Sequence, residues 1–419
     1  MTDAALDKRS FDRIPGGVAT PRGFWAGAAT CGLKPSGNPD VALVASDRLA
    51  SAAGVFTRSA FAAAPVRLDR ATLAASGGRA RAVVANSGNA NAATGPDGDA
   101  AARAMQAAAA AAVGCAPEHV LVLSTGVIGQ PLDVAKIARG IAAAGEALGA
   151  GGGPSAAEAI MTTDTHPKTA ARRVRLSGGN VVLGGMAKGA GMIHPDMATL
   201  LAVVTSDVAR EPAALAADLA LAADASFNRI SIDGDTSTND SVIALANSAS
   251  GVAVATEGDV ALWRGALVDL CLDLAHQIVR DGEGVTRFVA IQVSGAASDA
   301  EAHRVANAVA TSPLVKTAFA GGDPNWGRIL AAAGRSGARI EPERTSLAFA
   351  PGADDGDGPA LALVEGGLPT GYDERAAEAI LAGDAFRVLL DLGLGAGAAT
   401  VWTGDLTAEY VRINADYRT

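Results

Sequence analysis

Short hydrophobic runs alternate with alanine-rich segments along the first half of the chain. The runs rich in β-branched residues predict strands: VALVAS (41–46), RAVVANS (81–87) and HVLVLS (119–124). Residues 97–113 have the composition of a helix, with Asp97 or Asp99 near its N-cap and Gly114 just beyond its end. A second alanine-rich helix is predicted over residues 132–148.

The pattern changes from residue 171 onward. Residues 171–185 read as two strands that turn at Gly178-Gly179, which predicts a β-hairpin. Residues 259–280 repeat hydrophobic positions every three or four residues, as a long amphipathic helix does. A new strand–helix unit begins after residue 287. We therefore predict an α/β protein with mixed sheets, with one domain over residues 1–287 and a smaller α/β domain over residues 288–419.

Composition and charge restrict the classes of function that the protein can have. The chain has 419 residues, of which 49% are hydrophobic and 19% charged, as in a globular protein. A net charge of -10 argues against a nucleic-acid partner, which would require a basic face, and favours a small-molecule substrate.

The remaining composition points to a cytoplasmic protein. Three widely spaced cysteines fit a reducing compartment, and the five histidines are scattered without the spacing of metal ligands. The charged N-terminus lacks the hydrophobic stretch of a secretory signal, and no hydrophobic run is long enough to span a membrane.

The candidate chemistry is concentrated in KGAGMIHPDMATLL (188–201). Thr199 could simply begin a strand, but several glycines and Lys188 precede it at close spacing. A threonine hydroxyl needs a base to become a nucleophile, and its own α-amine serves if the residue becomes an N-terminus. Cleavage between Ala198 and Thr199 would create such an amine, with a pKa of roughly 7.7 to 8.0.

This segment closely resembles the self-cleavage motif of ornithine acetyltransferases, the bifunctional glutamate N-acetyltransferases of cyclic arginine biosynthesis. Further stretches match this family in order: NSGNANAATG (86–95), LSTGVIG (123–129), MTTDT (161–165), SIDGDTSTND (231–240), DGEG (281–284) and GGDPNWGRI (321–329). The resemblance runs from residue 23 to residue 419. It implies an ornithine acetyltransferase or DmpA-like fold with mixed sheets layered between helices.

The resemblance also implies a reaction. The precursor would cut itself between Ala198 and Thr199, giving an α-chain of residues 1–198 and a β-chain of residues 199–419. Thr199 would then take the acetyl group of N-acetylornithine and pass it to glutamate in a ping-pong cycle. The family needs no metal or nucleotide cofactor, and acetyl-CoA supplies the acetyl group in its second activity. Assembly into an α2β2 heterotetramer is implied as well.

The family's site residues carry over to matching positions here. Thr125 and Gly126 correspond to the oxyanion hole, which the loop after the predicted strand 119–124 could form. The positions that correspond to substrate contacts are Thr162, Lys188, Thr199, Glu283, Asn414 and Thr419. Thr162 is favoured over Thr163, and Asn414 and Thr419 are expected on a pinned terminal strand.

Other conspicuous polar residues have a simpler interpretation. The loop SIDGDTSTND contains the residues of Asx-turns, so we expect Asp233, Asp235 and Asn239 to be structural or to lie behind the residues that contact substrate. Its Asp-Gly-Asp triplet lacks a second carboxylate cluster, so no magnesium site is predicted. Trp326 is expected in the core.

Two alternatives remain at this point. An N-terminal-nucleophile aminopeptidase or amidase of related fold would use water as the acceptor, and an amino-acid-binding protein would stay uncleaved. Within the transferase family, members with one activity and with two share these motifs, so the motifs do not decide whether acetyl-CoA is a co-substrate. They also do not separate an arginine-pathway enzyme from a paralogue of secondary metabolism.

Overall fold

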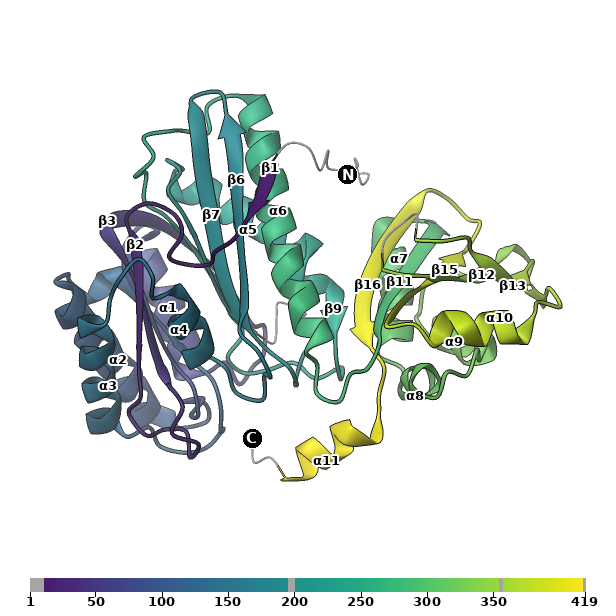
Figure 1. Ribbon diagram of the computed structural model, residues 1–419, viewed down its shortest axis with the longest axis horizontal. Coiled ribbons are helices and arrows are strands. Elements are labelled where there is room, and N and C mark those ends of the chain that lie inside the picture. The colour runs from purple at the N-terminus through teal and green to yellow at the C-terminus, as the bar shows by residue number, and fades with distance from the viewer. Residues whose placement is uncertain (1–10, 195–199, 354–356, 417–419) are drawn as a thin grey trace. The chain divides into compact units, whose positions relative to one another are not determined.

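The computed structural model describes residues 11–194, 200–353 and 357–416. The chain forms two compact units, each with its own sheet (Figure 1). The first unit consists of the chain up to Asn228 together with Asp235–Ile278, and the second of Arg229–Gly234 together with the chain from Val279. Residue 287, where the sequence predicts a boundary, lies inside the second unit.

The first unit is built on a nine-stranded mixed sheet. Its strands are β1 (Phe11–Ile14), β2 (Phe24–Ala29), β3 (Val41–Phe56), β4 (Arg79–Asn86), β5 (Val120–Ser124), β6 (Lys168–Leu176), β7 (Gly179–Lys188), β8 (Leu201–Ser206) and β10 (Ser241–Ala246). They follow the order β1-β6-β7-β8-β10-β3-β4-β5, and β2 also pairs with β3. The predicted strands and the hairpin are present, although β3 is far longer than predicted and the hairpin turns at Ser177-Gly178, one residue before the predicted Gly178-Gly179.

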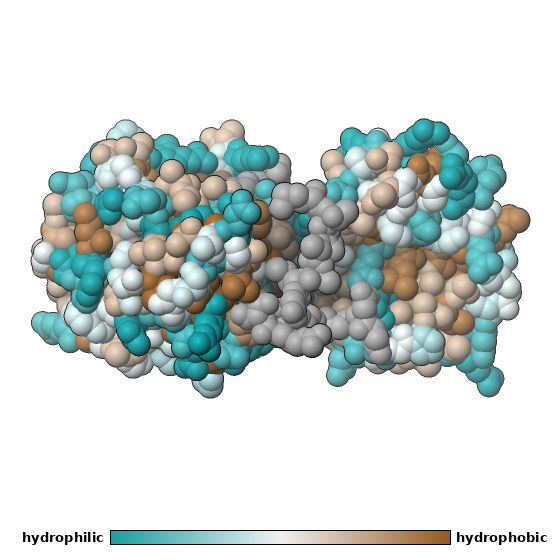
Figure 2. Space-filling model, turned by 90° about the horizontal axis from the view of Figure 1, so that it is seen from above, coloured by the Kyte–Doolittle hydropathy of each residue, from teal (hydrophilic) through white to brown (hydrophobic). Residues whose placement is uncertain are grey.

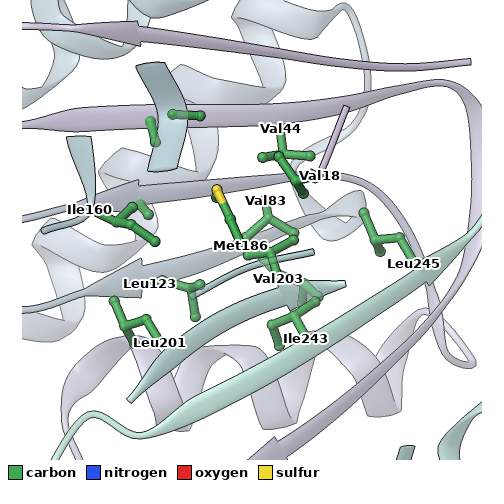
Figure 3. Packing of buried hydrophobic residues seen from close by; sticks show 14 of the residues in the cluster. Val18, Val44, Val83, Leu123, Ile160, Met186, Leu201, Val203, Ile243 and Leu245 are labelled. Carbon is green, nitrogen blue, oxygen red and sulfur yellow. The ribbon is translucent and has the colours of Figure 1, made fainter. Parts of the chain in front are cut away.

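The long strand β3 belongs to both halves of this sheet. Its first part pairs with β2 and β4, and its last part pairs with β10, with an irregularity between Ala45 and Ala50. One buried hydrophobic cluster draws side chains from both halves, among them Val83 and Leu123 from one and Met186 and Val203 from the other (Figure 3). The two halves therefore enclose a common core, because β3 brings them together.

Helices cover the outer faces of the sheet. They are α1 (Ala64–Ala75), α2 (Gly95–Val113), α3 (Val134–Glu146), α4 (Gly153–Ala159), α5 (Pro212–Ala225) and α6 (Glu257–Arg280), with short 3-10 turns at Pro117–His119 and Phe227–Arg229. A second cluster joins α2 and α3 to β3, β4 and β5, and Figure 1 shows α6 beside β6 and β7. The predicted layering of mixed sheets between helices is confirmed.

α2 begins at Gly95, two residues before the predicted start, and Asp97 lies near its N-cap as predicted. The N-cap is Thr94, and Asp97 lies in the first turn, where its charge favours the helix dipole. Asp99 instead pairs with Arg67 at 2.5 Å. The end is as predicted, since Gly114 takes the left-handed conformation at φ 66°.

The second unit has a seven-stranded mixed sheet with the order β14-β13-β12-β15-β11-β16-β9. Its strands are β9 (Ile230–Ser231), β11 (Phe288–Ala296), β12 (Ser346–Pro351), β13 (Leu361–Glu365), β14 (Leu368–Pro369), β15 (Ala385–Asp391) and β16 (Gly397–Gly404). Its helices are α7 (Asp299–Ala310), α8 (Pro313–Gly321), α9 (Trp326–Gly334), α10 (Glu374–Leu381) and α11 (Ala408–Asp416), with a 3-10 turn at Pro342–Arg344. One hydrophobic cluster joins the sheet to α7–α10, and Trp326 is partly buried against it.

A buried lysine of α8 donates hydrogen bonds to the last residues of β16. Lys316 of α8 donates from Nζ to Thr403 Oγ1 at 2.7 Å and to the Gly404 carbonyl. Burial lowers the pKa of Lys316 from its ordinary 10.5 to about 8, although the carboxylates of Asp405 and Asp233 oppose that shift. The protonated Lys316 ammonium is therefore less stable in the folded protein than in water. It lies next to the residues that lead into α11.

The C-terminal residues correct the sequence prediction of a terminal strand. Residues 408–416 form the helix α11, in which Arg412 pairs with Glu409 one turn earlier. The alternation of apolar and polar residues in YVRIN suggested a strand, but no strand of the described sheet lies beside this segment, and Val411 is exposed. Intrahelical hydrogen bonds satisfy the backbone instead.

None of the helices in the described part of the chain is both long enough and apolar enough to cross a membrane. On the face shown in Figure 2, hydrophobic residues are interspersed with hydrophilic ones.

Candidate active site

The predicted oxyanion residues follow directly after β5. The Thr125 backbone N–H donates to the Asn86 carbonyl at 3.0 Å, and Ser124 Oγ donates to Asn86 Oδ1 at 2.7 Å. Because the Thr125 N–H is already engaged, the group that Thr125 can offer to a ligand is its side-chain hydroxyl. No hydrogen bond of that hydroxyl is recorded among residues 11–194, 200–353 and 357–416.

Gly126 is required by the geometry of this loop. Its φ of +126° is a conformation that L side chains rarely adopt. A Cβ at this position would lie 2.4 Å from the carbonyl carbon of Gly88. The loop after β5 therefore packs against the NSGNANAATG loop with a closeness that only glycine permits.

The asparagines of NSGNANAATG hold these loops in place. Asn86 Nδ2 donates to the Asn89 carbonyl at 2.8 Å, and Asn89 Nδ2 reaches the carbonyls of Gln130 and Pro131. Asn91 adopts a positive φ of 48° and donates to the Gly98 carbonyl at 2.9 Å. All three side chains are buried. The hydrogen bonds of these asparagine side chains thus fix the backbone of the loops beside Thr125.

Asp164 connects two of the predicted substrate-binding residues. Its carboxylate accepts hydrogen bonds from the backbone N–H of Thr162 at 2.9 Å and from that of Gly189 at 2.7 Å. It also pairs with Lys168 Nζ at 2.7 Å and lies 4.0 Å from Lys188 Nζ. Thr162, Lys188 and the glycine that follows Lys188 are therefore organised around one buried carboxylate.

Several charged groups surround the Asp164 carboxylate. Burial alone would raise the pKa of Asp164, but the ammonium groups of Lys188 and Lys168 hold it well below its usual range. Lys34 lies in the same electrostatic environment, together with the carboxylates of Asp40 and Glu158, and burial lowers its pKa. A lysine ammonium in such a cluster is a point charge suited to bind an anionic group.

Ala198 and Thr199, the predicted cleavage pair, lie outside the described residues. The described chain resumes at Leu200, whose carbonyl accepts a hydrogen bond from the Ser241 N–H at 3.0 Å. β8 then lies between β7 and β10, with Leu201 opposite Lys188 on one side and Ser241 on the other. The residue before the cleavage segment, His194, accepts from Thr236 Oγ1 at 2.8 Å.

In the second unit, the structure brings Glu283 and Asn414 together. Asn414 Nδ2 donates to Glu283 Oε2 at 2.7 Å, and Glu283 is buried. The contact depends on close packing of α11 against the DGEG loop, because a Cβ on Gly284 would lie 2.6 Å from the Tyr410 nitrogen. Thr407 Oγ1 also donates to the Gly284 carbonyl at 2.7 Å. Thr419 lies outside the described residues.

The meeting of Asp164 with Lys168 and Lys188 is not predicted by the sequence. Asp164 and Lys168 lie in or beside MTTDT, yet nothing in the local sequence shows that their side chains meet near Lys188. The sequence predicts that Asn239 is structural or lies behind the residues that contact substrate. Its Nδ2 donates to the carbonyls of Ala90 at 2.6 Å and Ser124 at 2.8 Å. Asp233 accepts from Tyr410 OH at 3.3 Å. Among the described residues, no group of three or more His, Cys, Asp or Glu side chains could hold a metal ion.

Comparisons with known proteins give the family. The sequence profile of the ArgJ family matches residues 25–419. The chain is 45% identical over 413 residues to the arginine biosynthesis bifunctional protein ArgJ of Gloeobacter violaceus, covering 98% of this chain and 99% of the relative. It is 47% identical over 410 residues to the protein of that name from Symbiobacterium thermophilum, covering 97% and 99%.

Among solved structures, the ornithine acetyltransferase of Mycobacterium tuberculosis, complexed with ornithine, is 41% identical. That match covers 45% of this chain and 100% of the other, with a TM-score of 0.41. The match to the family profile and the identity to full-length relatives agree with the motifs found in the sequence. This chain belongs to the ArgJ family.

Proposed function

We propose that this protein is an acyltransferase of arginine biosynthesis that moves the acetyl group of N-acetylornithine to glutamate, giving ornithine and N-acetylglutamate. The observation that carries the proposal is the family match over residues 25–419, together with relatives that are named as bifunctional arginine biosynthesis proteins. The intact pair Ala198-Thr199 supports the self-processing that this chemistry requires.

The first step is cleavage of the precursor. Thr199 Oγ1 attacks the Ala198 carbonyl carbon, and the peptide C–N bond breaks as the nitrogen takes up a proton, which leaves an ester. Water then hydrolyses this ester to give the Ala198 carboxylate and a free Thr199 hydroxyl. The new α-amine of Thr199 has a pKa near working pH and serves as the general base.

The transfer steps reuse this nucleophile. The α-amine accepts the hydroxyl proton as Oγ1 attacks the acetyl carbonyl of N-acetylornithine, and ornithine leaves with that proton on its α-nitrogen. The α-amine of glutamate then attacks the acetyl-threonine ester, and Thr199 recovers its proton. Each half-reaction passes through a tetrahedral oxyanion, which the Thr125 hydroxyl and the Gly126 backbone stabilise.

Charged groups select the amino-acid substrates. The lysine-rich cluster around Asp164 supports a role for Lys188 in binding a substrate carboxylate, with Thr162 beside it. Glu283 is suited to pair with an ammonium group such as the ornithine side chain, and Asn414 orients it. Thr419 completes the set of substrate contacts. Removal of that last residue is expected to raise the substrate KM.

Assembly and location are also part of the proposal. The two processed chains form an α2β2 heterotetramer that works in the cytoplasm and needs no metal or nucleotide cofactor. Native mass spectrometry measures the stoichiometry directly. A mass of one α-chain and one β-chain would refute the tetramer and leave the chemistry intact.

Intact mass spectrometry of the purified, denatured protein is the first test. Two species, one that ends at Ala198 and one that begins at Thr199, are expected for the wild type, and a single full-length species for Thr199→Ala. Incubation of the processed enzyme with N-acetylornithine and glutamate should then yield N-acetylglutamate. A fully active Thr199→Ala protein would refute the mechanism.

Acceptor and donor assays separate the remaining alternatives. Release of acetate from N-acetylornithine without glutamate would favour the amidase alternative. Formation of N-acetylglutamate from acetyl-CoA and glutamate would establish the second activity, and its absence would leave an enzyme with one activity.

A further inference from the structure

We propose that Asn239 is a positioning residue that holds the oxyanion loop in place relative to the start of β8. This inference rests on the function proposed above, and it assigns to Asn239 a role in both self-cleavage and acetyl transfer. The residue itself does not contact substrate. It acts on Thr125, which immediately follows one of its hydrogen-bond partners in the chain.

The side chain of Asn239 uses all of its polar groups. Nδ2 donates one hydrogen bond to the Ala90 carbonyl at 2.6 Å and another to the Ser124 carbonyl at 2.8 Å, while Oδ1 accepts from Thr238 Oγ1 at 2.6 Å. Asn239 is only 6% exposed. The planar amide therefore fixes two carbonyls from different loops at a set separation in a dry environment.

Both carbonyls belong to residues that frame the oxyanion loop. Ser124 directly precedes Thr125. Ala90 lies in the NSGNANAATG loop, and its N–H donates to the Val127 carbonyl at 3.0 Å. Thr125 and Gly126 are thus held at both ends, by Asn239 at Ser124 and by Ala90 at Val127.

The same short segment also holds the chain next to the nucleophile. Ser241 lies two residues after Asn239, and its N–H donates to the carbonyl of Leu200, the residue that follows Thr199. Ser241 Oγ donates to the Asn239 carbonyl at 3.0 Å, which braces the segment internally. Residues 239–241 therefore connect the residue before Thr125 to the residue after Thr199 through successive hydrogen bonds.

This connection has a chemical consequence. An oxyanion donor works only if it lies within hydrogen-bond distance of the oxygen that becomes negative, and small misplacements reduce the rate steeply. Without the Asn239 amide, two buried carbonyls lose their donor and the loop can relax away from β8. Substrate groups held elsewhere would still bind. Loss of the Asn239 amide should therefore lower the rate of the chemical steps and leave the affinity for substrate unchanged.

The test compares Asn239→Ala with a matched control, Asn247→Ala. Asn247 follows the opposite end of β10, is also buried, and donates from Nδ2 to the Arg22 carbonyl at 2.9 Å and to Ser46 Oγ at 3.2 Å. Each variant thus removes one buried asparagine that lies next to an end of β10. Three quantities are measured for each: the rate of self-cleavage by intact mass, steady-state kcat and KM with N-acetylornithine and glutamate, and the unfolding midpoint.

We expect Asn239→Ala to lower kcat and the self-cleavage rate by about 10- to 100-fold. The affinity for ornithine, measured by calorimetry, should stay unchanged. Asn247→Ala should lose a similar amount of stability and keep both rates. Asn239→Asp, which has nearly the same volume but cannot donate when ionised, should behave like Asn239→Ala and provides the test if the alanine variant does not fold.

The opposite results are equally clear. If both Asn239 variants cleave and turn over as fast as Asn247→Ala, the positioning role is refuted. If they lose ornithine affinity in proportion to kcat, the residue acts on binding and the inference is wrong. If the wild type itself shows neither cleavage nor transfer, the proposed function fails instead, whatever the variants do.

Discussion

The Asn414 amide donates to Glu283 Oε2 at 2.7 Å, so a residue of the last helix orients a buried carboxylate in the DGEG loop. A carboxylate that pairs with a substrate ammonium must point in one direction, and a neutral amide fixes that direction without cancelling the charge. In the proposed function, the C-terminal helix would therefore act on substrate recognition through the orientation of Glu283.

Replacement of Asn414 by alanine should weaken the binding of N-acetylornithine. Loss of a hydrogen bond to a charged group corresponds to roughly a tenfold rise in KM, with a smaller change in kcat. Steady-state kinetics with N-acetylornithine as the varied substrate measure this. Asn325→Ala, which removes the N-cap of α9 in the same unit, is the control, and an equal rise in KM in that variant would contradict the assignment.

Thr125 should act through its hydroxyl. Because its backbone N–H already bonds to Asn86, Thr125→Val keeps the shape of the side chain and removes the hydroxyl, the group that Thr125 itself can offer to an oxyanion. We expect kcat to fall roughly 10²- to 10³-fold with little change in KM. Thr125→Ser should restore most of the rate. A valine variant with normal kcat would remove Thr125 from the oxyanion hole.

Asp164→Asn should reduce both stability and activity. The substitution breaks the buried ion pair between Asp164 and Lys168, and the loss of one partner of such a pair costs about 3–5 kcal/mol. It also removes the carboxylate that lies beside Lys188 Nζ and accepts from the Gly189 N–H, so KM for glutamate should rise. Chemical denaturation and steady-state kinetics, both at a temperature where the variant is folded, measure the two effects.

The control for Asp164 is Asp218→Asn. Asp218 is also fully buried and pairs with Arg210 at 2.8 Å and Arg264 at 2.7 Å, away from the Asp164 cluster. It should lose comparable stability while its KM for glutamate stays normal. If both variants changed KM equally, the effect of Asp164 would be one of general stability.

Lys316 predicts a specific dependence of stability on pH. Its pKa is about 8 in the folded protein and 10.5 ordinarily, so between these values the unfolded chain binds more protons than the folded one. The free energy of unfolding should rise with pH across that window, by up to about 3 kcal/mol from this group. Urea denaturation at pH 7.5 and pH 10, compared between wild type and Lys316→Met, isolates the effect. A difference between the two proteins that did not change with pH would contradict the prediction.

The sequence predicted those features that depend on local chemistry. Gly114 ends α2 and Gly179 begins β7 directly after the hairpin turn, and both take a positive φ that glycine favours. The family motifs identified Thr125, Lys188, Glu283 and Asn414 as candidate site residues. The structure adds the partners of two of them: Lys188 lies beside Asp164, and Asn414 donates to Glu283.

Other features depend on contacts between distant parts of the chain. The strand that begins at Val41 continues to Phe56 because β10 pairs with its second part, and no local signal announces that partner. The alternating residues after Tyr410 fit a helix or a strand equally well until the packing of Gly284 against Tyr410 is known. Asn239 looked like an ordinary turn residue because its partners, Ala90 and Ser124, lie more than a hundred residues earlier.

The position of β8 has a consequence for the processed enzyme. β8 and β10 come after the proposed cut, yet β7 and β3 on either side of them come before it, with six paired positions along each of these two junctions. Cleavage would thus turn one folded unit into a heterodimer in which the β-chain supplies two adjacent central strands of a sheet otherwise formed by the α-chain. Unfolding would then separate two molecules, so the melting temperature of the processed enzyme should rise with protein concentration. The melting temperature of an uncleaved Thr199→Ala chain would depend on protein concentration only through the dissociation of a larger assembly, because its two halves stay covalently joined.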